Sequence, residues 1–150
     1  MKVFNGIEEV IAAEGADLGT THWVEIDQAR VDQFADATGD HQWIHVDPDR
    51  AKEGPFGGTI AHGFLTLSML PVLQQQLYRV DGITMAVNYG LNKVRFPAPV
   101  PVGSKVRASL KIAKVTPLEG AIQVEFTTTI EVEGSAKPAC IVESIARYVA

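Results

Sequence analysis

The segment from Gly63 to Leu77 constrains the fold more than any other part of the chain. A helix through it would be apolar around nearly its whole circumference, with only Thr66 and Ser68 as polar residues before the three glutamines near its end. Such a pattern is typical of a helix that is buried on almost every side. Pro71 lacks an N–H and crowds the carbonyl four residues earlier, so we expect a kink there. The rest of the chain must therefore wrap around this helix.

Three segments near the C-terminus have the pattern of β-strands. Lys105–Ile112 and Ile122–Val132 alternate between apolar and polar residues, and the alternation slips after Ile112, as it would at a β-bulge. Ala139–Val149 is apolar on both faces, which predicts a central or covered strand. Together with the apolar helix, these strands predict an α+β fold in which a helix packs on an antiparallel sheet.

Shorter elements are expected before the apolar helix. The sequence favours a helix over Gly6–Glu14, a strand over Thr21–Ile26 and a helical turn over Pro48–Ala51. Between them, Asp27 is suited to cap the start of a further helix and Gly39 is suited to cap its end. The residues that follow Gly39 would then form a loop.

Length and composition predict one compact domain over residues 1–150, since 46% of the residues are hydrophobic. No apolar run is long enough to span a bilayer, and we expect no secretory leader. The lone Cys140 excludes an intrachain disulfide and a cysteine-based zinc cluster. The net charge of −5 disfavours nucleic acid as a partner. These features favour a cytoplasmic protein without a membrane or nucleic-acid partner.

The bases are concentrated in Gly90–Lys114, which contains no acid. Such a stretch could attract a phosphate group. Alternatively, these side chains lie on the solvated face of strands and pair with Glu125, Glu131 or Glu133 on neighbouring strands. The two interpretations are compatible, because a solvated basic face can also bind a phosphate.

The residues best suited to chemistry are Asp40 and His45, which lie five residues apart after Gly39 and shortly before Gly63. A carboxylate and an imidazole that face one point can hold a water molecule and move its protons. The unpaired N–H groups at a helix start can stabilise a negatively charged oxygen. Taken singly, Asp40 could be only a turn residue and His45 only a structural histidine. Together these residues indicate addition or removal of water beside a carbonyl.

Three ordered segments resemble one protein family. Gly39–His45 resembles the Gly-Asp-x-Asn-Pro-[aliphatic]-His signature of the MaoC-like, (R)-specific enoyl-CoA hydratases. Ile60–Leu65 resembles the family's entry into its central helix, and Asn88–Val100 resembles its strand and rim segment. The combination is most similar to a NodN-like branch. The resemblance implies a single MaoC-like domain with a hot-dog fold, in which a curved antiparallel sheet wraps a long central helix.

The resemblance also implies roles for single residues. Asp40 and His45 match the catalytic dyad, and Gly63 matches the glycine whose N–H binds the thioester oxygen. The expected substrate-binding residues are Gln42, Ile60, Ala61, His62, Asn88 and Tyr89, and the candidate phosphate contacts are Lys93 and Arg95. His62 has two further interpretations, as an alternative acid or, more favoured, as a residue that orders the preceding loop. The signature is broken at Gln42-Trp43, where the family has Asn-Pro; Gln42 can still form hydrogen bonds, while Trp43 adds bulk near the acyl pocket.

The implied activity is syn addition of water to a trans-2-enoyl-CoA, which gives a (3R)-3-hydroxyacyl-CoA. No metal and no separate cofactor are expected, because the thioester already acidifies C2 and coenzyme A is part of the substrate. One alternative is the reverse reaction on acyl carrier protein, as a 3-hydroxyacyl-ACP dehydratase. A thioesterase is disfavoured because Gly63–Leu77 contains no acid. A non-catalytic acyl-CoA-binding module remains a third alternative. We expect a homodimer, in which the apolar last strand is compatible with the contact between subunits.

Overall fold

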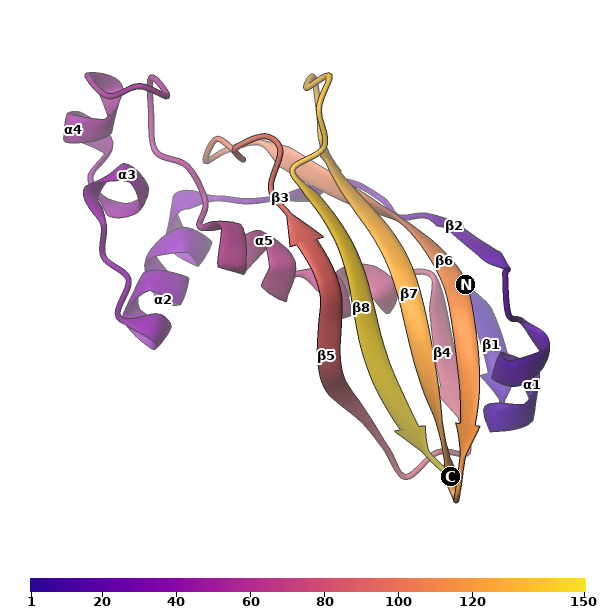
Figure 1. Cartoon of the computed structure of the whole chain (residues 1–150). Helices are drawn as coiled ribbons and strands as arrows, with labels where there is room; N and C mark the ends of the chain where they lie inside the picture. The colour runs from indigo at the N-terminus through magenta and orange to yellow at the C-terminus, as the bar shows by residue number, and fades with distance from the viewer.

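The computed structural model describes residues 1–150 and is built on a curved antiparallel sheet (Figure 1). Its strands run in the order β2-β6-β7-β8-β5, and β3 pairs with β6 beside β2. The strands of this sheet are β2 Asp17–Thr20, β3 Val24–Glu25, β5 Met85–Arg95, β6 Lys105–Leu118, β7 Ala121–Val132 and β8 Cys140–Val149. The α+β class that the sequence predicted is confirmed.

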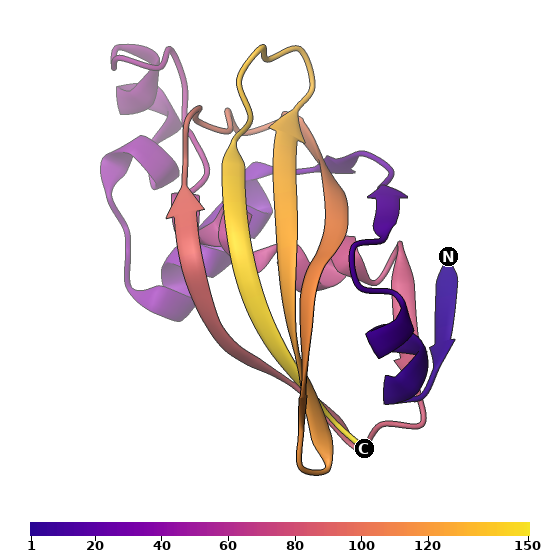
Figure 2. The same ribbon diagram turned by 45° about the vertical axis from the view of Figure 1, so that its right-hand side comes forward.

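Two short helices, α5 (Gly63–Ser68) and α6 (Leu70–Gln74), lie behind this sheet in both views (Figures 1 and 2). Leu65, Met69 and Leu73 are at most 5% exposed and pack into the larger hydrophobic core. The single kinked helix expected up to Leu77 is wrong in detail, because the helix breaks at Met69 and ends at Gln74. Proline in the first turn of α6 is tolerated there, since that N–H would have no intrahelical acceptor.

The expectation that this helical segment is buried on nearly every side is also wrong in part. Phe64 is 70% exposed and Val72 is 44% exposed, although both are apolar. One side of α5 and α6 therefore faces away from the sheet. Part of the apolar surface that the sequence predicted to be buried is therefore exposed in this chain.

The long strands agree with the alternation and the bulge that the sequence predicted. The β6–β7 ladder shifts between Ile112 and Lys114, which confirms the predicted bulge. Arg107 on β6 lies opposite Glu131 on β7 and forms an ion pair with it, so the solvated-face interpretation holds for this base. The last strand, β8, lies between β7 and β5, which confirms its central position. Strand β5, beyond β8, is the free edge of the sheet on that side.

The N-terminal region contains elements that the sequence did not indicate. Strand β1 (Lys2–Asn5) pairs in parallel with β4 (Tyr78–Asp81), and α1 (Ile7–Ala12) follows β1. Tyr78 is only 8% exposed and belongs to a second hydrophobic cluster. The strand expected over Thr21–Ile26 is reduced to β3, while the neighbouring β2 was missed.

Three helices lie together beside the β5 side of the sheet: α2 (Gln28–Thr38), α3 (Trp43–Val46) and α4 (Pro48–Lys52) (Figure 1). The predicted caps of α2 are confirmed, because Asp27 accepts a hydrogen bond from the N–H of Arg30 and Gly39 adopts the left-handed conformation with φ 81°. The helix α3 was not expected, and it contains His45. None of the helices is both long and apolar enough to cross a lipid bilayer.

A pair of buried tyrosines joins the small sheet to the large one. The hydroxyls of Tyr78 and Tyr148 are 2.6 Å apart, and the ring of Tyr78 stacks on Phe126 with the ring centroids 5.6 Å apart. Burial raises the pKa of both phenols, so both hydroxyls stay protonated and form one hydrogen bond between them.

We predict that Tyr78→Phe and Tyr148→Phe each lower the free energy of unfolding by about 1–3 kcal/mol, because each leaves one buried hydroxyl without its partner. The double substitution should lower it by less than the sum of the two, since no hydroxyl is then left unpaired. Urea unfolding of the four proteins measures both effects. Strictly additive losses would contradict the assignment of this hydrogen bond.

Candidate active site

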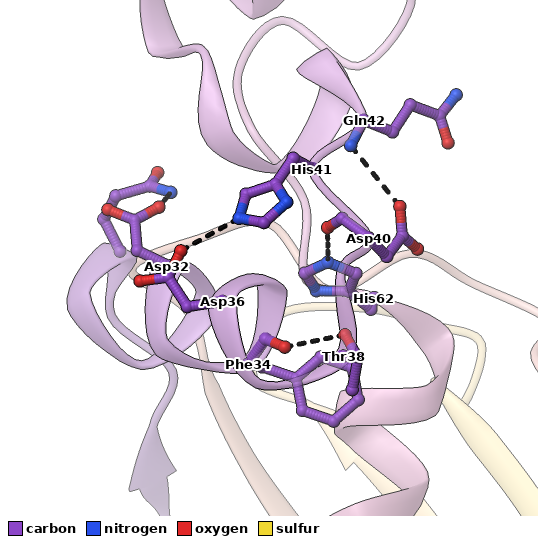
Figure 3. A network of polar contacts seen from close by, with 9 residues as sticks. Asp32, Phe34, Asp36, Thr38, Asp40, His41, Gln42 and His62 are labelled. Carbon is purple, nitrogen blue, oxygen red and sulfur yellow. Dashed lines mark hydrogen bonds and ion pairs between the residues drawn. The ribbon is translucent and has the colours of Figure 1, made fainter.

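Asp40 lies on the exposed loop between α2 and α3. One carboxylate oxygen accepts a hydrogen bond from the N–H of Gln42 at 3.4 Å, and the main-chain carbonyl accepts one from Nε2 of His62 at 2.9 Å (Figure 3). The neighbouring His41 forms an ion pair with Asp36 of α2, which ties the loop to that helix. The Asp40 backbone is thus held from the protein side while its carboxylate remains accessible to solvent.

His45 lies in α3 and is only 6% exposed. Its Nδ1–H donates a hydrogen bond of 2.6 Å to the carbonyl of Ile60, which leaves Nε2 without a proton in the neutral ring. Burial lowers the pKa of His45, repulsion from His62 lowers it further, and the bond to Ile60 and the charge of Asp40 oppose these effects. The imidazole is therefore a neutral base near pH 7.

A half-buried amide, that of Gln28, fixes the backbone around His45. Nε2 of Gln28 donates to the carbonyl of His45 at 2.7 Å, and Oε1 of Gln28 accepts from the hydroxyl of Thr59 at 2.7 Å. The N–H of Ile60 donates to the carbonyl of Ile44 at 3.0 Å. Sequence reasoning missed Gln28 and Thr59, because their contacts join residues distant in sequence and follow no local motif.

His62 brings the two members of the dyad together. It is 3% exposed, its ring stacks on that of His45 with the centroids 3.9 Å apart and an interplanar angle of 25°, and its other face meets Phe34 at 4.9 Å. One carboxylate oxygen of Asp40 and one ring nitrogen each of His45 and His62 lie within 4.8 Å of one another. The convergence of Asp40 and His45 is therefore present in the structure.

The same three residues are also the group best suited to hold a metal ion. A zinc ion would have to lie about 2.0–2.1 Å from both imidazole nitrogens and near the plane of each ring. The two rings are stacked and nearly parallel, so their in-plane lone pairs do not point to a common position. This geometry suits proton transfer better than metal coordination.

Gly63, the first residue of α5, lies next to His62 and beside an apolar pocket. No backbone carbonyl accepts its N–H. The ring of Phe96 lies so close that a Cβ at position 63 would be 3.2 Å from it, which leaves little room for a side chain. The pocket has a volume of about 370 Å³ and includes Ile60, Ala61, Phe56 and Phe96 in its lining. Phe56 and Phe96 were not singled out from the sequence.

The other expected substrate-binding residues are distributed differently. Asn88 and Tyr89 lie on β5 and line a second pocket of about 420 Å³ between that strand and the α5–α6 segment. The side chain of Gln42 is exposed and turned away from the Asp40 carboxylate, so only its backbone contacts Asp40 (Figure 3). The candidate phosphate contacts Lys93 and Arg95 are exposed on β5, just before Phe96.

Trp43 packs against Arg50 and the turn after α4. Its ring receives the guanidinium of Arg50 at 4.4 Å, and a Cβ at Gly54 would lie 2.9 Å from the ring. It was expected to add bulk near the acyl pocket. In the structure it fills the space between α3 and the turn after α4.

The arrangement combines a neutral imidazole base, an accessible carboxylate and a free backbone N–H beside an apolar pocket. The carboxylate and the base nitrogen can hold one water molecule and move its protons. The N–H of Gly63 can donate to an oxygen that gains negative charge during a reaction. Because α5 has only six residues, the hydrogen bond from this one N–H stabilises that charge more than the helix dipole does.

Comparison with known proteins gives consistent results. A model of the MaoC like domain matches residues 10–134. The chain is 61% identical to 3-hydroxyacyl-thioester dehydratase Z of Mycobacterium tuberculosis (strain ATCC 25618 / H37Rv), with all of both chains covered. It is 43% identical to nodulation protein N of Rhizobium meliloti (strain 1021), covering 93% of this chain and 89% of that protein. The structure matches the (R)-hydratase from A. caviae with a TM-score of 0.71 and 27% identity, covering 89% of this chain and 94% of the other. The hot-dog fold is thereby confirmed, and the chain belongs to the family of MaoC-like dehydratases.

Proposed function

We propose that this chain is a hydro-lyase that adds water reversibly to trans-2-enoyl-CoA and gives a (3R)-3-hydroxyacyl-CoA. The observation that carries the proposal is the convergence of Asp40 and His45 next to Gly63. The names of the similar proteins, a 3-hydroxyacyl-thioester dehydratase and an (R)-hydratase, support the reaction class.

In the proposed mechanism, a water molecule binds between the Asp40 carboxylate and Nε2 of His45. The water oxygen attacks C3 of the enoyl group as the dyad removes one of its protons, and the dyad returns a proton to C2 on the same face. Negative charge gathers on the thioester oxygen during the attack, and the N–H of Gly63 stabilises it. The reaction needs no metal and no separate cofactor, because the thioester stabilises the enolate.

We predict that Asp40→Asn and His45→Gln each lower kcat for crotonyl-CoA hydration by at least about 10²-fold, since acid–base assistance contributes on the order of 10²–10⁴-fold. His22→Gln, at an exposed histidine outside the site, serves as the matched control. Loss of absorbance of the enoyl thioester measures the rate, and chiral analysis of the product tests the (R) configuration. A wild-type protein without activity, or dyad variants as active as the control, would contradict the proposal and favour a non-catalytic acyl-binding module.

Coenzyme A is the proposed handle of the substrate because Lys93 and Arg95 are exposed just before Phe96, at the edge of the pocket beside Gly63. A carrier protein is the alternative handle and is also acidic. We predict that Lys93→Gln with Arg95→Gln raises KM for crotonyl-CoA by roughly 3- to 10-fold, because each exposed charge contact contributes at most about 1 kcal/mol.

The same double variant should leave KM for crotonyl pantetheine unchanged, since that substrate lacks the nucleotide phosphates. Lys111→Gln, at another exposed base of the same stretch, is the control. Steady-state kinetics with both substrates measure the difference. Equal kcat/KM of the wild-type protein on crotonyl-CoA and crotonyl pantetheine would remove the case for recognition of coenzyme A.

A homodimer is the proposed assembly, with β5 rather than β8 at the contact. The backbone of β5 is unpaired along one edge, and an exposed apolar edge strand tends to pair with another chain. Alternate residues of β5 are apolar and 45–54% exposed: Met85, Val87, Tyr89 and Leu91. The exposed Phe64 and Val72 on the neighbouring helices extend the apolar surface.

We predict that the wild-type protein has the mass of a dimer at micromolar concentration and that Val87→Lys shifts it towards the monomer, because a charge would be buried at the contact. Leu118→Lys, at an exposed apolar residue at the far end of β6, should remain dimeric. Size-exclusion chromatography with light scattering measures the mass. A wild-type monomer under these conditions would refute the proposed assembly.

A further inference from the structure

We propose that His62 is the positioning residue of this site, which holds Asp40 through a hydrogen bond and His45 through ring stacking. The inference rests on the proposed function and assigns His62 a role other than substrate binding. Two independent contacts of one side chain support it, and each reaches a different member of the dyad.

The first contact orders the loop that carries Asp40. That loop is exposed, and the Asp40 carboxylate has only a long hydrogen bond, 3.4 Å, from the Gln42 N–H. Nε2–H of His62 donates to the Asp40 carbonyl at 2.9 Å, and the bond connects this loop to the residue that immediately precedes Gly63. The position of the carboxylate relative to the Gly63 N–H is therefore set through His62.

The second contact fixes the ring of His45. His62 lies between Phe34 and His45, with centroid separations of 4.9 and 3.9 Å. The hydrogen bond to Ile60 restricts rotation of the His45 ring within its plane, and stacking restricts its tilt. Together they direct Nε2 of His45, the proposed base.

The same contacts define the tautomer of the neutral His62 ring. Because Nε2 donates to a carbonyl, the neutral ring carries its lone pair on Nδ1, which is buried and has no hydrogen-bond partner in the protein. In this tautomer the one ring proton of His62 is engaged by the Asp40 carbonyl, so the side chain is poorly suited to act as the acid.

Two variants separate the contacts. His62→Phe retains an aromatic ring for stacking and removes the donor, whereas His62→Gln retains an N–H donor and removes the ring. We expect kcat for crotonyl-CoA hydration to fall by about 10- to 100-fold in both, with KM changed less than threefold, because a misplacement of about 1 Å costs on this order. His22→Gln is again the control. Variants with the kcat of the wild-type protein would overturn the inference.

The pH profile of kcat/KM provides a readout that a general loss of stability does not change. Asp40 and His62 are the ionisable groups whose charges act on His45, and a protonated His62 lowers the pKa of His45. Replacement of His62 by a neutral side chain should raise the pKa of His45. Because the base form of His45 is lost as the pH falls, the acid limb of the profile should move to higher pH in both variants. An unchanged limb would contradict contact between the two rings.

Nitrogen-15 NMR of the wild-type protein tests the inference even if the variants fail to fold. We expect a proton on Nε2 of His62 and on Nδ1 of His45. The opposite tautomer at His62 would exclude the bond to Asp40 and overturn the inference. A wild-type protein with these tautomers but without hydratase activity would refute the proposed function alone, whereas an active protein with unaffected His62 variants would refute only the positioning role.

Discussion

The hydrogen bond from Nδ1 of His45 to the carbonyl of Ile60 is the interaction on which the site depends. It joins a four-residue helix, which could not hold its own orientation, to the segment that leads into α5. Ile60 in turn forms an isolated β-bridge with Pro101, just ahead of β6. The imidazole is thereby anchored to the rim of the large sheet. A buried polar ring without such a partner would destabilise the fold, so the same bond stabilises the fold and orients the base of the proposed mechanism.

The break between α5 and α6 is related to the position of Gly63. Met69, at the break, is buried in the core, and the six residues of α5 place Gly63 against Phe96. In the proposed mechanism this apolar wall favours the hydrogen bond from the N–H of Gly63, because electrostatic stabilisation is stronger where water is excluded. The site is thus assembled from a polar loop on one side and an apolar pocket on the other, with His62 and Gly63 at the boundary.

Features with local causes were predictable from the sequence. The caps of α2 at Asp27 and Gly39 and the bulge after Ile112 follow from the conformational preferences of a few residues. The convergence of Asp40 and His45 could be predicted because both lie within one short motif. The β1–β4 pair could not be predicted, since the parallel pairing of Lys2 with Tyr78 joins distant segments.

The residues around Asp40 and His45 could not be predicted from the sequence for the same reason. Gln28 and Thr59 act through bonds to residues far along the chain, and neither belongs to a recognisable motif. The apolar pattern of β8 did not reveal that β5 would occupy the edge beside it, because strand order is set by the whole topology. Even the helix break at Met69 depends on packing as well as on Pro71.

The packing of Trp43 against Gly54 ties the unusual part of the signature to a second position. A methyl group on residue 54 would meet the indole at 2.9 Å, closer than any normal contact, so the ring in this position requires glycine there. The backbone oxygen of Ala51 would lie 3.2 Å from the same methyl group, so position 54 is restricted by the end of α4 as well as by the indole. The turn after α4 and the ring of Trp43 therefore pack as one unit that excludes a side chain at this position.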